Sequence, residues 1–322
     1  MTSTDAPCSQ RSVDIHEPLA GSAPPATAWI VVEHPGPWGR DALEDSGLNS
    51  DCVEHLRTAL ETHGVRTILA RRSRSRRAGT RDEPSTTENA HVPSPLRNVW
   101  VAACGPSGGI GRHGQMSDLS TLLQWDLEAL GQGVLPDFGV PMEEAWEFVC
   151  AHGKRDVCCA TSGRAYALAR QASALDAHVW ECSHLGGHRF APTCLFLPSG
   201  RLYGRLDAAG FYPAGSEPSA DFLRGASYLS PAAQAADQAV RSALAMPASA
   251  PTHLAEPDDL NNDLNDASTT MTVRTPEQGT WRVMCTANTI EAPASCGAPP
   301  TMRTVWQAEI AGAPSETHPD TP

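Results

Sequence analysis

Short apolar runs and helix-like repeats alternate along the first 140 residues. Apolar runs at 29–33, 65–70 and 98–104 predict three strands. Leucines at helical spacing predict one helix over 41–62, between the first two strands, and another over 117–130, after the third. The predicted order is therefore strand, helix, strand, strand, helix.

The next hundred residues repeat that order. Strands are predicted at 147–150 and 178–182, on either side of a helix over 162–175. Two further short runs joined by Pro198-Ser-Gly200 predict a hairpin, and a helix over 231–244 with a proline at its start follows. A βαβ unit, an antiparallel hairpin and a final helix form the thioredoxin-like order. The fold class expected is therefore α/β with two thioredoxin-like domains.

These elements divide the chain into segments. The two thioredoxin-like domains are expected over 28–140 and 141–246, and an acidic linker over 247–272 leads to a small β appendix over 273–311. The flanking segments, 1–27 and 312–322, are expected to form a polar lead-in and a disordered tail. Within the first domain, the polar segment 71–97 predicts a disordered arginine-rich loop, because it shows no hydrophobic period.

Composition limits the classes of function. At 322 residues and 40% hydrophobic positions, the chain is long enough for about two domains with a buried core. A formal net charge of −13 argues against general binding to nucleic acid or to an anionic membrane. The arginine-rich loop also lacks nearby aromatic residues that would stack on bases. No apolar stretch approaches the length of a spanning helix. Neither nucleic acid nor membrane is expected as a partner.

The ten cysteines point to the kind of chemistry. No basic region followed by an apolar run is visible at the start of the sequence, so no signal peptide is expected and the predicted location is cytoplasmic. Thiols stay reduced there, and clustered cysteines are then more often metal ligands or redox groups than disulfides.

Residues 150–205 hold most of the candidate chemistry. Cys150 ends a predicted strand and Cys159 begins a predicted helix, whose N-terminus favours the thiolate form that binds metals. His184 and His188 flank a Gly-Gly pair that allows the backbone to fold back, so that both imidazoles face one centre. Two thiolates and two imidazoles suit tetrahedral zinc or a mixed-ligand iron–sulfur cluster. The wide cysteine spacing fits a two-iron cluster at least as well as zinc.

The adjacent pair Cys158 and Cys159 leaves alternatives open. Either cysteine fits the position of the second thiolate. The same ligands would also suit a zinc-stabilised interaction module. A thiol oxidoreductase that uses both cysteines is a third hypothesis. The absence of a Cys-x-x-Cys motif from the sequence argues against it.

Other polar residues and cysteines of this region have more than one interpretation. His152 fits a turn residue, a hydrogen-bond donor beside the ligands or a competing ligand. Arg155 and Asp156 either brace their loop as an ion pair or set hydrogen bonds to metal-bound sulfurs. Cys182 and Cys194 fall in strand-like runs and are expected to pack in the core.

The sequence around these positions resembles a known family. The segments are Cys150-x-His-Gly-x-Arg-Asp-x-x-Cys159, Ser183-His-x-Gly-Gly-His-Arg-Phe-Ala-Pro-Thr193 and Gly200-x-x-Tyr-Gly-Arg-Leu206. They are similar to the sucrase/ferredoxin-like family. Glu17-Pro-Leu19, Glu33-His-Pro-Gly-Pro-Trp-Gly39 and Ser295-Cys-Gly297 are also similar to its bacterial members. The resemblance covers most of residues 10–310.

The resemblance implies a thioredoxin-like ferredoxin whose [2Fe–2S] cluster is held by two cysteines and two histidines. Carried over by position, the ligands are Cys150, Cys159, His184 and His188. Cys159 is preferred to Cys158 because the family's second cysteine stands three places after its aspartate. The first domain has no equivalent ligand set, so it is expected to lack a cluster. Four residues are expected to surround the ligands: His152, Arg155, Asp156 and Arg189.

Such a centre implies an electron carrier rather than an enzyme. With only two thiolates, the oxidised core is formally neutral, so the potential is expected within roughly −150 to +300 mV, above that of four-cysteine ferredoxins. An exposed imidazole nitrogen would make that potential fall as pH rises. The acidic composition favours a basic reductase or acceptor protein as partner. No sucrase activity is expected, because no motif marks the two carboxylates that glycoside hydrolysis requires.

Overall fold

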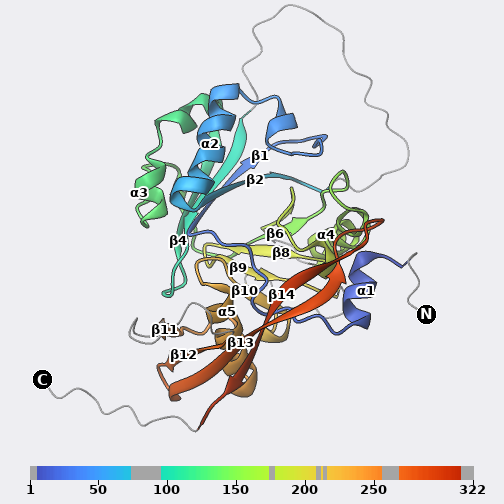
Figure 1. Cartoon of the computed structure of the whole chain (residues 1–322). Coiled ribbons are helices and arrows are strands. Elements are labelled where there is room, and N and C mark those ends of the chain that lie inside the picture. The colour runs from blue at the N-terminus through green and yellow to red at the C-terminus, as the bar shows by residue number, and fades with distance from the viewer. Residues whose placement is uncertain are drawn as a thin grey trace, which may run out of the picture.

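The structure is a computed structural model that describes residues 6–73, 96–173, 178–207, 212, 216–255 and 268–312 (Figure 1). Within these ranges the chain forms one ten-stranded sheet and one four-stranded sheet, both flanked by helices. The architecture is therefore mixed α/β. None of the described helices is long and apolar enough to cross a membrane.

The first half of the large sheet is built around a parallel pair of strands. β1 (Ala28–Glu33) and β2 (Val65–Arg71) are parallel and are connected through α2 (Ser50–His63). β3 (Arg97–Ala103) runs antiparallel to β1, and β4 (Ile110–Met116) runs antiparallel to β3. The short β5 (Val140–Pro141) completes the spatial order β2-β1-β3-β4-β5.

Capping explains the bounds of α2. The side chain of Asn49 accepts hydrogen bonds from the backbone N–H groups of Asp51 and Cys52, and so satisfies donors that the first turn leaves free. Gly64 ends the helix in a left-handed conformation. A short 3-10 turn, Glu44–Ser46, precedes it. The helix therefore begins nine residues later than the predicted start at residue 41, because residues 41–49 form turns and an irregular connection.

The second half of the sheet has the same order. β6 (Trp146–Cys150) and β7 (Val179–Cys182) are parallel and are connected through a π-helical turn, Cys159–Gly163, and α4 (Arg164–Ser173). β8 (Cys194–Leu197), β9 (Arg201–Tyr203) and β10 (Leu223–Ala226) follow by antiparallel pairing. The spatial order is β7-β6-β8-β9-β10, and antiparallel pairing of β2 with β7 joins the two halves into one sheet.

Side-chain alternation along the strands creates a core shared by the two halves. On β1, Trp29 and Val31 face this core, whereas Ile30 packs on the opposite face with Leu56 of α2. On β6, Phe148 and Cys150 face the shared core, whereas Val149 faces the side of α4. The buried Trp100 and Trp180 rings meet edge to face there, 4.7 Å between centroids. The thiol of Cys150 therefore lies on the face of the sheet that forms the shared core.

The last part of the chain forms the second sheet. Its antiparallel strands are β11 (His253–Ala255), β12 (Ser268–Thr275), β13 (Gly279–Pro293) and β14 (Pro300–Ile310). α5 (Pro231–Ala243) packs small side chains such as Ala236 against Met271 and Val283 of this sheet. Figure 1 shows β13 and β14 extending from α5 towards α1 (Cys8–Asp14), so the turn between these two strands lies beside the start of the chain.

Several elements differ from the expectations. The predicted lead-in 1–27 contains α1, and the hydrophobic pattern missed β4 because glycine and histidine interrupt it. The predicted helix 117–130 is two pieces, a 3-10 turn at Leu119–Gln124 and α3 (Leu127–Gly131), because Asp126 caps a new helix start. Smaller 3-10 turns occur at His188–Phe190 and Ala220–Phe222.

The segments predicted to lack structure are only partly described. The predicted linker 247–272 contains β11 and the start of β12, so the appendix has four described strands instead of the two predicted over 273–311. In β12 the inward positions Met271, Val273 and Thr275 do alternate with outward ones, but only two of the three are apolar, so the hydrophobic signal is short. The predicted loop 71–97 falls mostly on residues 74–95, outside the described residues, and so do residues 313–322 of the tail.

Candidate metal centre

Three of the four predicted ligands meet at one point. Cys150 at the end of β6, Cys159 at the start of the π-helical turn and His184 in the loop after β7 each offer a ligand atom, and these atoms lie within 4.8 Å of one another. The Sγ of Cys150 is 3.9 Å from Nδ1 of His184. Both cysteines are fully buried, whereas His184 is partly exposed. Two thiols and an imidazole at this separation are a compatible donor set for zinc or for iron.

His188 lies beside this group. Its ring stacks near that of His184, with 5.4 Å between centroids. Its Nε2 is 2.7 Å from the carbonyl oxygen of Ala294, which only accepts, so Nε2 carries the proton. The neutral ring then has a lone pair on Nδ1, which is buried and has no hydrogen-bond partner among the described residues. A backbone carbonyl that fixes the tautomer in this way is the usual arrangement behind a metal-binding histidine.

Neighbouring groups favour the thiolate of Cys150. A hydrogen bond from the Cys159 thiol, together with the nearby imidazole of His184, lowers the pKa of Cys150 well below its usual range despite burial. The same pairing raises the pKa of Cys159, because Cys159 is the donor. The pair therefore favours the thiolate at Cys150, and binding a metal would require the thiol of Cys159 to release its proton.

The backbone of the second half holds these residues in place. The N–H of Cys150 donates to the carbonyl of Thr193 at 2.9 Å, immediately before β8, the strand that borders β6. The loop that carries His184 is fixed to β2, because Ser183 N–H donates to the carbonyl of Leu69 and its Oγ accepts from Leu69 N–H. The ligands thus lie at the join between the two halves of the sheet.

A buried arginine supports the Gly-Gly turn between the two histidines. Arg224, on β10, donates through Nη1 to the carbonyl of Gly186 at 3.0 Å and through Nε to Ser22 Oγ at 3.1 Å. Its side chain is 1% exposed, and burial lowers the pKa of Arg224. Gly186 and Gly187 both have positive φ, of 80° and 72°. The turn therefore combines a backbone conformation suited to glycine with a fixed positive charge behind it.

The residues expected around the ligands are not all close to them. His152 is buried and places Nε2 2.6 Å from the carbonyl oxygen of Gly39, while its Nδ1 has no partner in the described part of the chain. Arg155 lines a cavity of about 210 Å³ together with Arg40, His152 and His184. Arg189 instead forms an ion pair with the buried Glu17. The cavity gives His184 an opening to solvent from the side of the first half.

Asp156 and Cys158 belong to a second group. Their side chains lie with Cys8 and Cys296, with ligand atoms within 4.8 Å of one another. Arg155 is therefore not the partner of Asp156 in the described contacts, since Asp156 accepts from the backbone N–H groups of Cys158 and Cys296. Although burial disfavours the carboxylate, these hydrogen bonds lower the pKa of Asp156. The structure thus directs Cys159, and not Cys158, towards Cys150 and His184.

A comparison with models of protein families gives a match over part of the chain. The model of the sucrase/ferredoxin-like family matches residues 19–212, more than half of the chain. The chain belongs to the sucrase/ferredoxin-like family. The matched region of this sucrase/ferredoxin-like protein contains all four predicted ligands, whereas Cys8 and Cys296 fall outside it. No curated protein and no solved structure matches the chain.

Some residues of the site carried little signal in the sequence. Arg224 is one of many arginines, and nothing in its neighbourhood marks it as buried beneath the Gly-Gly turn. Cys8 stands alone near the start of the chain and meets Cys296 only because α1 packs beside the β13–β14 turn. Cys182 and Cys194 are buried in the apolar clusters of the sheet and join neither group of ligand atoms.

Proposed function

We propose that this sucrase/ferredoxin-like protein is an electron carrier whose second half holds a [2Fe–2S] cluster through Cys150, Cys159, His184 and His188. The observation that carries the proposal is the convergence of the first three ligand atoms beside the buried Nδ1 of His188, which has no hydrogen-bond partner within the described ranges. When bound, such a cluster supplies reversible one-electron redox chemistry. The family's name and the donor set both support this proposal.

Burial differs between the two sides of the centre. Cys150 and Cys159 are at most 1% exposed, whereas the two histidines are partly exposed. The histidine side is therefore the shorter route for an electron between the centre and a partner. His188 donates its Nε2 proton to the carbonyl of Ala294, so His184 is the imidazole proposed to exchange a proton with solvent and to make the potential depend on pH.

The arrangement of the sheet supports two thioredoxin-like domains as part of the proposal. Each half places its parallel strand pair beside an antiparallel pair, in the orders β2-β1-β3-β4 and β7-β6-β8-β9. The proposed cluster ligands come only from the second half. The first half contributes Gly39, through its contact with His152, and the cavity wall formed by Arg40.

The partner in this proposal is a reductase or an acceptor protein with a basic face, because the chain carries a net charge of −13. We also propose a reducing compartment such as the cytoplasm. All ten cysteines lie in the described part of the chain as free thiols. Separate placement of Cys158 and Cys159 disfavours their joint use as a redox dithiol, since their sulfurs join different groups.

A matched pair of variants tests the ligand assignment. Cys159→Ser removes a proposed cluster ligand and is expected to abolish the visible absorption of the anaerobically purified protein and its bound iron. Cys158→Ser changes the adjacent buried cysteine, whose sulfur joins the other group of ligand atoms, and is expected to retain more iron and more absorption than Cys159→Ser. Loss of iron in Cys158→Ser with retention in Cys159→Ser would overturn the assignment. A colourless wild-type protein with zinc at Cys150 and His184 would instead establish the zinc-stabilised module.

A further inference from the structure

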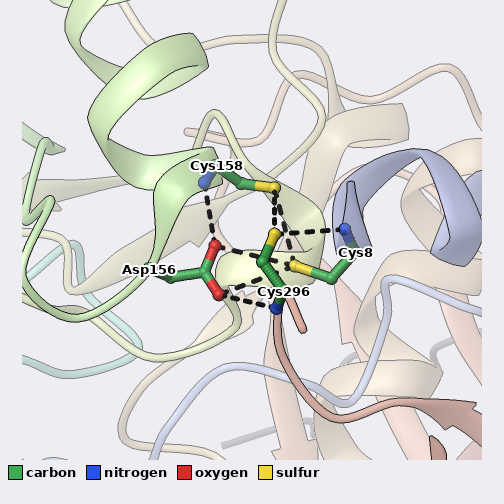
Figure 2. A group of neighbouring side chains, drawn as sticks. All are labelled: Cys8, Asp156, Cys158 and Cys296. Carbon is green, nitrogen blue, oxygen red and sulfur yellow. Dashed lines mark hydrogen bonds between the residues drawn. The ribbon is translucent and has the colours of Figure 1, made fainter. Parts of the chain in front are cut away.

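A second cluster of sulfurs, separate from the predicted iron ligands, includes the carboxylate of Asp156. Figure 2 shows Cys8, Cys158 and Cys296 pointing towards one another, with the carboxylate of Asp156 closing the group. They come from three distant parts of the chain: the start of α1, the residue directly before the π-helical turn, and the turn between β13 and β14. Cys8 and Cys158 are 0% and 1% exposed, and Cys296 is partly exposed.

The separations match the edges of a tetrahedron around one metal ion. Two sulfurs at about 2.3 Å from a tetrahedral zinc lie about 3.8 Å apart, and a sulfur and a carboxylate oxygen lie about 3.5 Å apart. The Sγ of Cys158 is 3.5 Å from that of Cys8 and 3.3 Å from that of Cys296. The Sγ of Cys8 is 3.7 Å from Oδ1 of Asp156. Little movement is therefore needed to place an ion between the four groups.

Hydrogen bonds to the sulfurs give an independent indication. The backbone N–H of Cys8 donates to Sγ of Cys296 at 3.3 Å, and the hydroxyl of Ser9 donates to Sγ of Cys158 at 3.3 Å. Donors aimed at sulfur stabilise a thiolate, which is the form that binds a metal. A buried cysteine that serves only to fill space needs no such donors.

From these observations we propose that Cys8, Cys158, Cys296 and Asp156 bind one Zn²⁺ ion, in a site separate from the proposed iron–sulfur centre. Three thiolates and a carboxylate are donors that zinc accepts in closed, four-coordinate structural sites. The thiols release their protons as the ion binds, so affinity rises with pH. Because the geometry stands without any cluster at Cys150 and His184, the proposal does not depend on the proposed function.

The position of this site indicates a structural role. The ion would connect α1 and the β13–β14 turn to the start of the helical segment that carries Cys158 and Cys159. The same turn supplies the carbonyl of Ala294 that fixes the tautomer of His188, and Asp156 Oδ2 lies 3.8 Å from Nε2 of that ring. Zinc would therefore hold in place three segments that surround the histidine side of the neighbouring centre.

The test counts metals in the full chain and in three variants. Cys8→Ser and Cys296→Ser each remove one proposed zinc ligand far in sequence from Cys150 and His184. Cys104→Ser is the matched control, because Cys104 is also a partly buried free cysteine but lies in neither group. Protein prepared under reducing conditions is analysed for zinc and iron, and metal-free wild-type protein is then titrated with Zn²⁺ and, separately, with Co²⁺.

The expected result is one zinc per chain in the wild type and in Cys104→Ser, and loss of that zinc in the other two variants. Re-addition of Zn²⁺ to metal-free wild-type protein should raise the Tm, and Co²⁺ should produce sulfur-to-cobalt absorption that Cys296→Ser lacks. The wild-type titrations keep the test valid if a variant fails to fold. Iron content is counted separately, so failure of the proposed electron carrier does not mimic failure of the zinc site.

Two results would overturn the zinc site. One is a zinc content that is the same in the wild type as in Cys8→Ser and Cys296→Ser, both after preparation and after titration with Zn²⁺. The other is a disulfide between Cys158 and either Cys8 or Cys296, because that bond would consume two of the three proposed thiolates. It would be detected by peptide mass spectrometry of protein whose thiols were blocked at lysis.

Discussion

The Gly-Gly turn between His184 and His188 allows one comparison that isolates the role of buried Arg224. Gly186 and Gly187 both have positive φ, so alanine at either position costs roughly 1–2 kcal/mol of backbone strain. They differ in their surroundings. A Cβ on Gly186 meets nothing within 4 Å, whereas a Cβ on Gly187 would lie 2.5 Å from Nη2 and 2.7 Å from Cζ of Arg224.

The guanidinium cannot move aside without losing its partners. Cβ contacts below 3.0 Å are essentially never seen, so Arg224 must shift by at least about half an ångström. It is fully buried and donates to Gly186 and to Ser22. A hydrogen bond from a charged group contributes about 1.5–3 kcal/mol. Gly186→Ala should therefore lower the free energy of unfolding by about 1–2 kcal/mol, and Gly187→Ala by about 2.5–5 kcal/mol.

Urea unfolding of the two variants, followed by far-UV circular dichroism, measures this difference, and iron content measures its effect on the site. Gly187→Ala should also lose iron, because the shift occurs next to His188 and metal–ligand distances tolerate only about 0.2 Å. Gly186→Ala should retain its iron. Equal stabilities and equal iron contents in the two variants would refute the role given to Arg224.

Two further predictions concern the ligands and the core of the second half. His184→Cys and His188→Cys should each retain the iron but lower the reduction potential, because a thiolate replaces an imidazole. His184→Cys should also make the potential less dependent on pH. Protein-film voltammetry between pH 6 and 9 checks both effects, and an unchanged potential would contradict the ligand assignment. Arg170→Met removes the partner of Glu147, a pair that is 4% exposed on each side, and should cost about 3–5 kcal/mol of stability at pH 7 in urea unfolding. Burial raises the pKa of Glu147, so below that pKa the folded variant holds a neutral carboxyl. The loss of unfolding free energy relative to wild type should therefore shrink as pH falls. An equal loss at pH 4.5 and pH 7 would argue against an unpaired charge at Glu147 in the variant.

Local patterns were sufficient to predict the main strands and part of the site. Cys150 ends a run of apolar residues and Cys159 stands near a helix start, so their meeting follows from the βαβ connection itself. The Gly-Gly pair signalled a turn that brings His184 and His188 together. These features depend on short-range geometry, which residue order specifies directly.

Features that depend on distant contacts were not predictable in this way. Gly111 and Gly114 interrupt the apolar pattern of β4, and this strand is recognised only by its pairing with β3. Cys8 and Cys296 are 288 positions apart, and nothing in either neighbourhood indicates the other. Whether Cys158 or Cys159 is the second thiolate ligand likewise depends on where each side chain points. Two adjacent positions in the sequence do not reveal that direction.

The most direct test of the proposed electron carrier is the visible absorption spectrum of the anaerobically purified full chain, before and after dithionite, with iron, sulfide and zinc counted in the same sample. The account predicts a coloured protein with about two irons and two sulfides per chain that bleaches on reduction, together with one zinc at the cysteine–aspartate site. A protein that stays colourless and iron-free after cluster reconstitution would contradict it.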